Sequence, residues 1–141
     1  MNLPDVNVLF ARVCTRHVHH PAADRWYRGA REKGERWALC RITQLAMLRL
    51  LTNPITMASE ALSAKSAWDV LDQLEADPLC QFQEEPASCW TEFKRISEIT
   101  GFARSGWTDA YLAAFATASG NRIVTFDRRF SDWPQIRCLI L

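Results

Sequence analysis

The chain alternates short apolar runs with longer amphipathic segments, and this alternation restricts its fold more than any other feature of the sequence. The short runs are separated by helix-length stretches, so consecutive strands are not joined by tight hairpins. Strands with helices between them form a parallel sheet that helices cover on both faces. We expect strands ending at Asp5 and over 37–40, 79–82, 122–126 and 136–141, with helices over 7–13, 20–33, 43–51, 87–99 and 109–119.

Helix boundaries follow from capping residues. Pro21 suits the first turn of the second helix, and Asn53-Pro54 should end the third. Thr108 is expected to cap the last helix, and Gly120 to end it. A further helix is expected after Ser59 as its cap, with an apolar face that includes Ala64, Ala67, Trp68, Leu71 and Leu74.

Composition describes an ordinary globular chain. With 141 residues, 48% hydrophobic and 23% charged, residues 1–141 are expected to form a single domain. The longest apolar run, 110–116, is too short to span a bilayer, and no basic segment precedes an apolar stretch at the N-terminus. The five cysteines are scattered and form no Cys-x-x-Cys pair. We therefore expect a cytoplasmic protein with reduced thiols and no membrane contact.

Basic residues give an ambiguous indication of nucleic-acid binding. The formal net charge is only +1, but 14 of the 17 basic residues are arginine. Guanidinium groups suit phosphates, because their fork of donors matches the phosphate oxygens. An arginine-rich genome would give the same composition. The histidines of the segment 17–20 resemble a metal tract, but a loop leading into the second helix accounts for them better.

Three aspartates are placed where the expected fold would bring them together. Asp5 and Asp127 each follow an expected strand, and Asp109 lies in the first turn of a helix. In a parallel sheet these positions share the carboxyl edge, where ligands bind. Clustered carboxylates repel one another unless a cation neutralises them, and oxygen donors without cysteine favour Mg²⁺ or Mn²⁺. Spacing alone leaves open that each aspartate is only a turn or cap residue.

Two other enzyme and signalling classes with doubly wound sheets do not match. A phosphate-accepting receiver domain needs a lysine near its last strand, but the lysines are at 33, 65 and 94. A haloacid-type phosphatase needs a second aspartate two residues after the first, and Asn7 occupies that position.

Four segments in order resemble those of PIN-domain ribonucleases, specifically the VapC-type toxins of toxin–antitoxin modules. The segments are 5–9 (DVNVL), 43–54 (TQLAMLRLLTNP), 107–114 (WTDAYLAA) and 124–130 (VTFDRRF). The resemblance covers essentially the whole chain. It implies a three-layer α/β sandwich with a central, mostly parallel sheet, an acidic pocket for Mg²⁺ or Mn²⁺, and cleavage of RNA by metal-activated water. It also implies a homodimer that a VapB-like antitoxin inhibits.

Residue roles are carried over by matching positions. Asp5, Asp109 and Asp127 match the family's catalytic and metal-binding acids, while Gln44 stands where the family commonly has a glutamate. The expected auxiliary residues, which would orient carboxylates or waters, are Gln44, Asn7, Thr108 and Thr125. Three arginines could contact RNA or a partner: Arg49 on the helix of Gln44, and Arg128 and Arg129 directly after Asp127. Gln44 motivates the alternative hypothesis of a non-catalytic PIN module that binds RNA or antitoxin without cutting.

Overall fold

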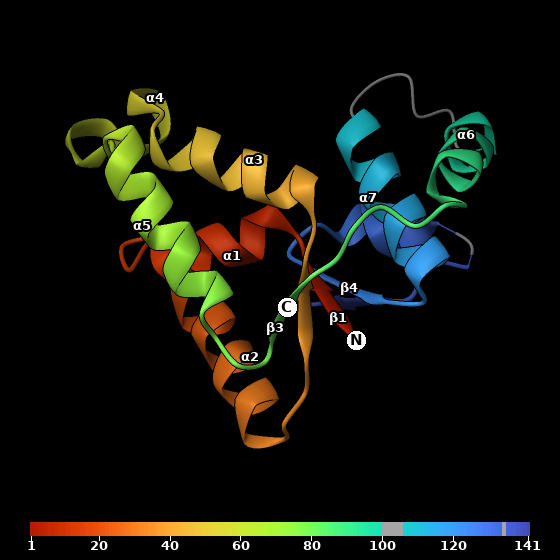
Figure 1. Cartoon of the computed structure of the whole chain (residues 1–141), viewed down its shortest axis with the longest axis horizontal. Helices are drawn as coiled ribbons and strands as arrows, with labels where there is room; N and C mark the ends of the chain where they lie inside the picture. Colours follow the sequence, from red (N-terminus) through yellow and green to blue (C-terminus); the bar gives the residue numbers. More distant parts are fainter. Residues whose placement is uncertain (100–105, 134) are drawn as a thin grey trace.

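The five strands of the computed structural model pair in parallel to form one sheet with the order β3-β2-β1-β4-β5 (Figure 1). The structure describes residues 1–99, 106–133 and 135–141. The strands are β1 (Asn2–Pro4), β2 (Trp37–Leu39), β3 (Cys80–Phe82), β4 (Arg122–Thr125) and β5 (Cys138–Ile140). The predicted parallel sheet is therefore confirmed, with β1 at its centre.

Helices connect the strands, as the alternation in the sequence predicts. They are α1 (Val6–Val13), α2 (His20–Glu32), α3 (Arg41–Leu51), α4 (Pro54–Met57), α5 (Ala64–Glu75), α6 (Cys89–Ile99) and α7 (Trp107–Ser119), with short 3₁₀ turns η1 (Ala58–Glu60) and η3 (Arg128–Asp132). Among the described residues, no helix has the length and hydropathy needed to cross a membrane. The five cysteines are all free thiols, as expected.

Alternate strand residues pack on opposite faces of the sheet, which gives three layers. Leu3 and Ile123 pack with the buried face of α7, together with Phe93 of α6. On the other face, the side chains of Leu39 and Val124 lie in clusters formed with α1, α2, α3 and α5. Figure 1 shows α6 and α7 lying together, well separated from α5. The sandwich that the sequence predicted is thus present.

Two of the predicted helix starts are wrong. Ser59 lies in η1, and the N-cap residue of the next helix is Ser63, four residues later, whose hydroxyl accepts a hydrogen bond from the backbone N–H of Ser66 at 3.1 Å. Ser63 is the better cap because its backbone is extended, which lets its hydroxyl accept a hydrogen bond from the backbone N–H of Ser66 in the first turn of the helix. Trp68, expected on the apolar face of this helix, is 52% exposed.

The start of α7 also differs from the prediction. Gly106 is its N-cap residue, so Thr108 lies inside the first turn as an exposed residue and does not cap the helix. The end is as predicted, because Gly120 adopts a left-handed conformation with φ of 68° that favours glycine.

A buried carboxylate ties β2 and β3 to α2. Asp77, just before β3, accepts hydrogen bonds from the Tyr27 hydroxyl at 2.5 Å, Trp37 Nε1 at 3.3 Å and the Leu79 N–H at 3.0 Å. Arg31 Nη1 lies 3.2 Å from the same carboxylate. Burial opposes ionisation, but these donors together lower the pKa of Asp77 below its usual value. Each donor would lose its partner if Asp77 were removed.

We expect Asp77→Ala to lower the free energy of unfolding by about 2–4 kcal/mol, because it leaves the buried indole and hydroxyl donors without an acceptor. Denaturant unfolding at neutral pH measures the effect. The control is Asp69→Ala, which removes an exposed carboxylate on α5 paired with Lys65 at 3.5 Å and should change stability by less than about 0.5 kcal/mol. Equal effects from the two variants would contradict the role assigned to Asp77.

Candidate active site

The three predicted aspartates lie at the carboxyl edge of the sheet. Asp5 follows β1 and is the N-cap residue of α1, while Asp127 follows β4 and is the N-cap residue of η3. Asp109 lies in the first turn of α7. Because β1 and β4 are paired neighbours, with Pro4 opposite Val124, the chain leaves both strands at the same level. The expectation that these acids share one edge agrees with this placement.

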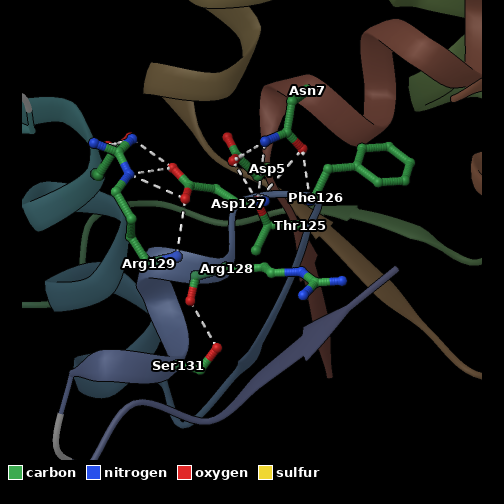
Figure 2. A network of polar contacts seen from close by, with 9 residues as sticks. Asp5, Asn7, Thr125, Phe126, Asp127, Arg128, Arg129 and Ser131 are labelled. Carbon is green, nitrogen blue, oxygen red and sulfur yellow. Dashed lines mark hydrogen bonds and ion pairs between the residues drawn. The ribbon is translucent and has the colours of Figure 1, made fainter. Parts of the chain in front are cut away.

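Asp5 is held by two polar side chains from different parts of the chain (Figure 2). The Thr125 hydroxyl donates to Asp5 Oδ2 at 2.8 Å, and Asn7 Nδ2 donates to the same oxygen at 2.7 Å. Asn7 Nδ2 also donates to the Thr125 hydroxyl at 3.0 Å, while its Oδ1 accepts the Phe126 N–H at 3.3 Å. Asn7 and Thr125 thus orient a carboxylate, which is the geometry their predicted auxiliary role needs.

Asp109 and Asp127 share a single guanidinium group. Arg129 Nη2 lies 3.2 Å from Asp109 Oδ2 and also contacts Asp127 Oδ2. Arg129 Nε donates to both oxygens of Asp127, at 3.0 Å and 2.8 Å. The Arg129 backbone N–H donates to Asp127 Oδ1 at 2.9 Å. Arg129 therefore bridges two of the three acids.

The three carboxylates differ in electrostatic environment. Burial raises the pKa of Asp5 to about 6; the bond from Thr125 opposes this shift, and the charges of Asp109 and Asp127 add to it. Burial also raises the pKa of Asp109, although Arg129 acts against the shift. The hydrogen bonds from Arg129 instead lower the pKa of Asp127. Negative charge at this edge is thus only partly compensated by Arg129.

The chemistry of the donors fits a hard divalent cation. The three acids offer carboxylate oxygens as ligand atoms, and their side-chain neighbours include the Thr125 hydroxyl, the Asn7 amide and the Arg129 guanidinium. Within residues 1–99, 106–133 and 135–141, however, no three His, Cys, Asp or Glu side chains converge closely enough to hold a metal ion as they stand. Asp5 is turned toward Thr125, and the other two acids are turned toward Arg129. Binding of an ion would require their carboxylates to reorient.

Gln44 is hydrogen-bonded at both ends of its amide. Its Oε1 accepts a hydrogen bond from Arg41 Nη1 at 2.8 Å, and its Nε2 donates to Glu75 Oε1 at the end of α5. The side chain is buried and links α3 to α5. The auxiliary role suggested by the sequence stays a prediction, and the structure adds that the contacts of Gln44 join two helices.

The other suggested residues are spread over the surface. Thr108 is exposed beside Asp109, and Arg49 is exposed near the end of α3. Arg128 is exposed as well, and in Figure 2 its side chain extends away from the carboxylates. Arg129 was expected only as an RNA or partner contact, and its bridge between two acids was missed. The Asp127-Arg128-Arg129 spacing, which allows a side-chain turn, was the available signal.

Comparison with known proteins agrees with this geometry. The family model of the PIN domain matches residues 3–135. "Ribonuclease VapC41" of Mycobacterium tuberculosis is 32% identical over 100% of this chain and 99% of its own length. "Ribonuclease VapC44" of the same species is 35% identical over 89% of this chain and 85% of its own.

Solved structures share the fold at lower sequence identity. VapBC2 from Rickettsia felis, bound to a DNA fragment from the promoter, superposes with a TM-score of 0.74 at 14% identity, covering 99% of this chain and 97% of that chain. VapC20 of Mycobacterium tuberculosis, described as a toxin that cleaves the sarcin–ricin loop, gives 0.71 at 14% identity, covering 97% and 99%. With its acids at the carboxyl edge of the same parallel sheet, this chain belongs to the PIN domain family, among the VapC-type ribonuclease toxins.

Proposed function

We propose that this chain is an endoribonuclease toxin that depends on Mg²⁺ or Mn²⁺, with Asp5, Asp109 and Asp127 as the ligands of the ion. The observation that carries the proposal is the gathering of three carboxylates at one sheet edge, where a single guanidinium contacts two of them. A divalent cation would supply the missing positive charge. The names of the relatives support RNA as the substrate.

The residues around the acids would prepare the site for such an ion. A bound Mg²⁺ or Mn²⁺ would polarise the phosphodiester and lower the pKa of an attacking water. Asn7 and Thr125 both donate to one oxygen of the Asp5 carboxylate and so fix its orientation, which limits the entropy lost when a ligand binds. Arg128 lies at the same edge with its guanidinium exposed, where it could contact the RNA backbone.

We further propose a homodimer that a VapB-like antitoxin inhibits. Among the solved structures with this fold, VapBC from Salmonella typhimurium, bound to DNA, covers 99% of this chain with a TM-score of 0.68 at 16% identity. The contact of Arg129 with two acids supports one route of inhibition, because a basic side chain from a partner could make the same contact.

The second candidate function is a PIN module that binds RNA or antitoxin without cutting. The observation in its favour is Gln44, which occupies a position where the family commonly has an acid and is engaged with Arg41 and Glu75. Three carboxylates remain at the sheet edge without it, so we favour the catalytic function. Metal-dependent cleavage separates the two.

The purified chain, freed of any antitoxin, should cut single-stranded or looped RNA with Mg²⁺ or Mn²⁺ and stop in excess EDTA. Asp109→Asn should reduce the cleavage rate by about 100-fold or more, because it removes one charge from the proposed ion site. The control Asp132→Asn alters an exposed carboxylate in η3 and should keep the rate within about twofold. Undiminished cleavage in EDTA would refute the metal dependence, and no cleavage of any RNA would favour the binding module.

Asp5→Asn should stabilise the metal-free protein at neutral pH. Because burial raises the folded-state pKa of Asp5 to about 6, the folded protein holds this proton more tightly than the unfolded chain does. Ionisation of Asp5 therefore destabilises the wild type as the pH rises from about 4 to about 6. Above that range we expect the free energy of unfolding of the variant to exceed that of the wild type by about 1–3 kcal/mol. Urea unfolding in EDTA across this pH range measures the gain, which should vanish toward the acidic end.

Asp127→Asn is the matched control with the opposite sign. Hydrogen bonds from Arg129 lower the pKa of Asp127, so its ionised form stabilises the fold at neutral pH. This variant should be less stable than the wild type at neutral pH and should lose that difference as the pH falls through the lowered pKa. A difference that does not change with pH in either variant would contradict the assigned environments.

The assembly can be tested without knowledge of the RNA target. Light scattering at concentrations well above micromolar should give the mass of a dimer, and co-expression with the product of the adjacent gene should give a complex that no longer cleaves RNA. A strict monomer, or a complex of unchanged activity, would count against this part of the proposal.

A further inference from the structure

Arg129 is held in a position that opposes metal binding. Its Nε donates to both Asp127 oxygens, at 3.0 Å and 2.8 Å, and its Nη2 lies 3.2 Å from Asp109 Oδ2. The same Nη2 also contacts Asp127. One guanidinium thus faces the oxygens of both acids that, with Asp5, would bind the ion.

The neighbouring arginine is arranged differently. Arg128 belongs to the same 3₁₀ turn, η3, but Figure 2 shows its side chain leading away from the carboxylates, while Arg129 lies against Asp127. The two side chains carry the same charge one residue apart. Arg129 contacts the acids and Arg128 extends away from them, which makes Arg128 a natural control.

A divalent cation and this guanidinium would compete for the same oxygen atoms. A carboxylate oxygen that accepts a short hydrogen bond from Arg129 has fewer lone pairs free for an ion. A metal ion bound to the same carboxylates would also be repelled by the positive charge of Arg129. The lack of any convergent ligand group in the described parts of the chain agrees with this, since Asp109 and Asp127 are turned toward Arg129. The Arg129 side chain is 53% exposed, so its ion pairs are partly screened by water and can be exchanged.

We propose that Arg129 is the built-in counter-cation of the acid site, that a divalent cation displaces it, and that the released guanidinium then binds a phosphate of the RNA. The proposal rests on the proposed function and adds the regulation of that same site. Guanidinium suits both roles, because its planar fork pairs equally well with carboxylate and with phosphate oxygens. The arginine would thereby couple loading of the metal to binding of the substrate.

Calorimetric titration of the metal-free protein with Mn²⁺ tests the first step. Arg129→Ala should bind Mn²⁺ at least about tenfold more tightly than the wild type, because the ion no longer has to displace a cation. Arg129→Lys should lie between the two, since an ammonium keeps the charge but lacks the fork. Arg128→Ala removes the same charge from the same turn and should change the Mn²⁺ affinity by less than about twofold.

The possible outcomes separate this proposal from the proposed function. Equal Mn²⁺ affinity in the wild type and Arg129→Ala, or weaker binding by Arg129→Ala, would overturn the displacement while leaving the metal site intact. An equal gain in Mn²⁺ affinity from Arg128→Ala would also overturn the displacement, because the loss of any nearby positive charge would then explain the tighter binding. No Mn²⁺ binding by any of these proteins would overturn both the metal site and the displacement.

The side chain itself can be followed by NMR. The ¹⁵Nε–¹Hε signal of Arg129, assigned by its absence from Arg129→Ala, should move on titration with diamagnetic Mg²⁺, while that of Arg128 should not. A signal of Arg129 that stays in place at saturating Mg²⁺ would show that the ion pairs persist, and would overturn the proposal.

Binding of a fluorescent single-stranded RNA oligonucleotide tests the second step. In Ca²⁺, offered as a divalent ion for binding measurements, Arg129→Ala should bind the RNA more weakly than the wild type, with a salt dependence reduced by about one phosphate contact. In EDTA the difference should be smaller, because the wild-type guanidinium is then held by the acids. The same loss in both conditions would mean that Arg129 contributes only general charge, and would overturn the release.

Discussion

The pairing of β1 with β4 is the interaction on which the rest of the site depends. These strands are far apart in the sequence, yet Pro4 lies opposite Val124, and the Asp5 N–H donates to the Val124 carbonyl at 2.8 Å. That register places Thr125 beside the Asp5 carboxylate, at 2.8 Å. A shift of one residue would turn the Thr125 side chain to the other face of the sheet and remove the bond. The pairing of β1 with β4 therefore fixes the position of Thr125 relative to Asp5 through the backbone.

Charge compensation is the second constraint, and it explains why the three acids are not equivalent. Asp127 has a guanidinium against both of its oxygens and a lowered pKa. Asp5 is 8% exposed, and the side chains that donate to it in the described part of the chain, Asn7 and Thr125, are neutral. Burial raises the pKa of Asp5, and its neutral donors oppose this rise less than a cation would. The sheet edge thus combines one well-compensated acid with two under-compensated ones, an arrangement that a fixed protein cation only partly relieves and a diffusible cation could complete.

The sequence predicted the features that depend on local periodicity and on the position of a residue after a strand. Strands, helices, the parallel sheet and the common edge of Asp5, Asp109 and Asp127 all follow from such patterns, and the structure contains them. The errors concern features that periodicity does not determine: at which residue a helix starts, which side chains stay exposed and which residues meet across the fold. Thr108 has the chemistry of a cap, but the helix begins one residue before it, and Trp68 fits a helical apolar stripe that leaves it half exposed.

The contacts of Arg129 were missed for the same reason. Its chain neighbour Asp127 is a local partner that a turn can supply, but Asp109 lies on a different element and meets Arg129 only in the folded chain. Sequence separation hides such pairs, since no periodicity connects a helix start to a 3₁₀ turn after a strand. The acids were therefore predictable as a group, while the cation that holds two of them was not.

Gln44 shows how the surroundings of a residue can decide its chemistry. Its amide accepts from Arg41 and donates to Glu75, so both ends of the side chain have partners in a buried position. A glutamate there could accept from Arg41, but it could not donate to Glu75 unless it were protonated, and two facing carboxylates would raise each other's pKa. The amide is thus the residue that satisfies this pair of neighbours. With Gln44 hydrogen-bonded to Arg41 and Glu75, the three acids of the sheet edge are Asp5, Asp109 and Asp127. Their three negative charges are enough to neutralise a single divalent cation fully without a fourth acid.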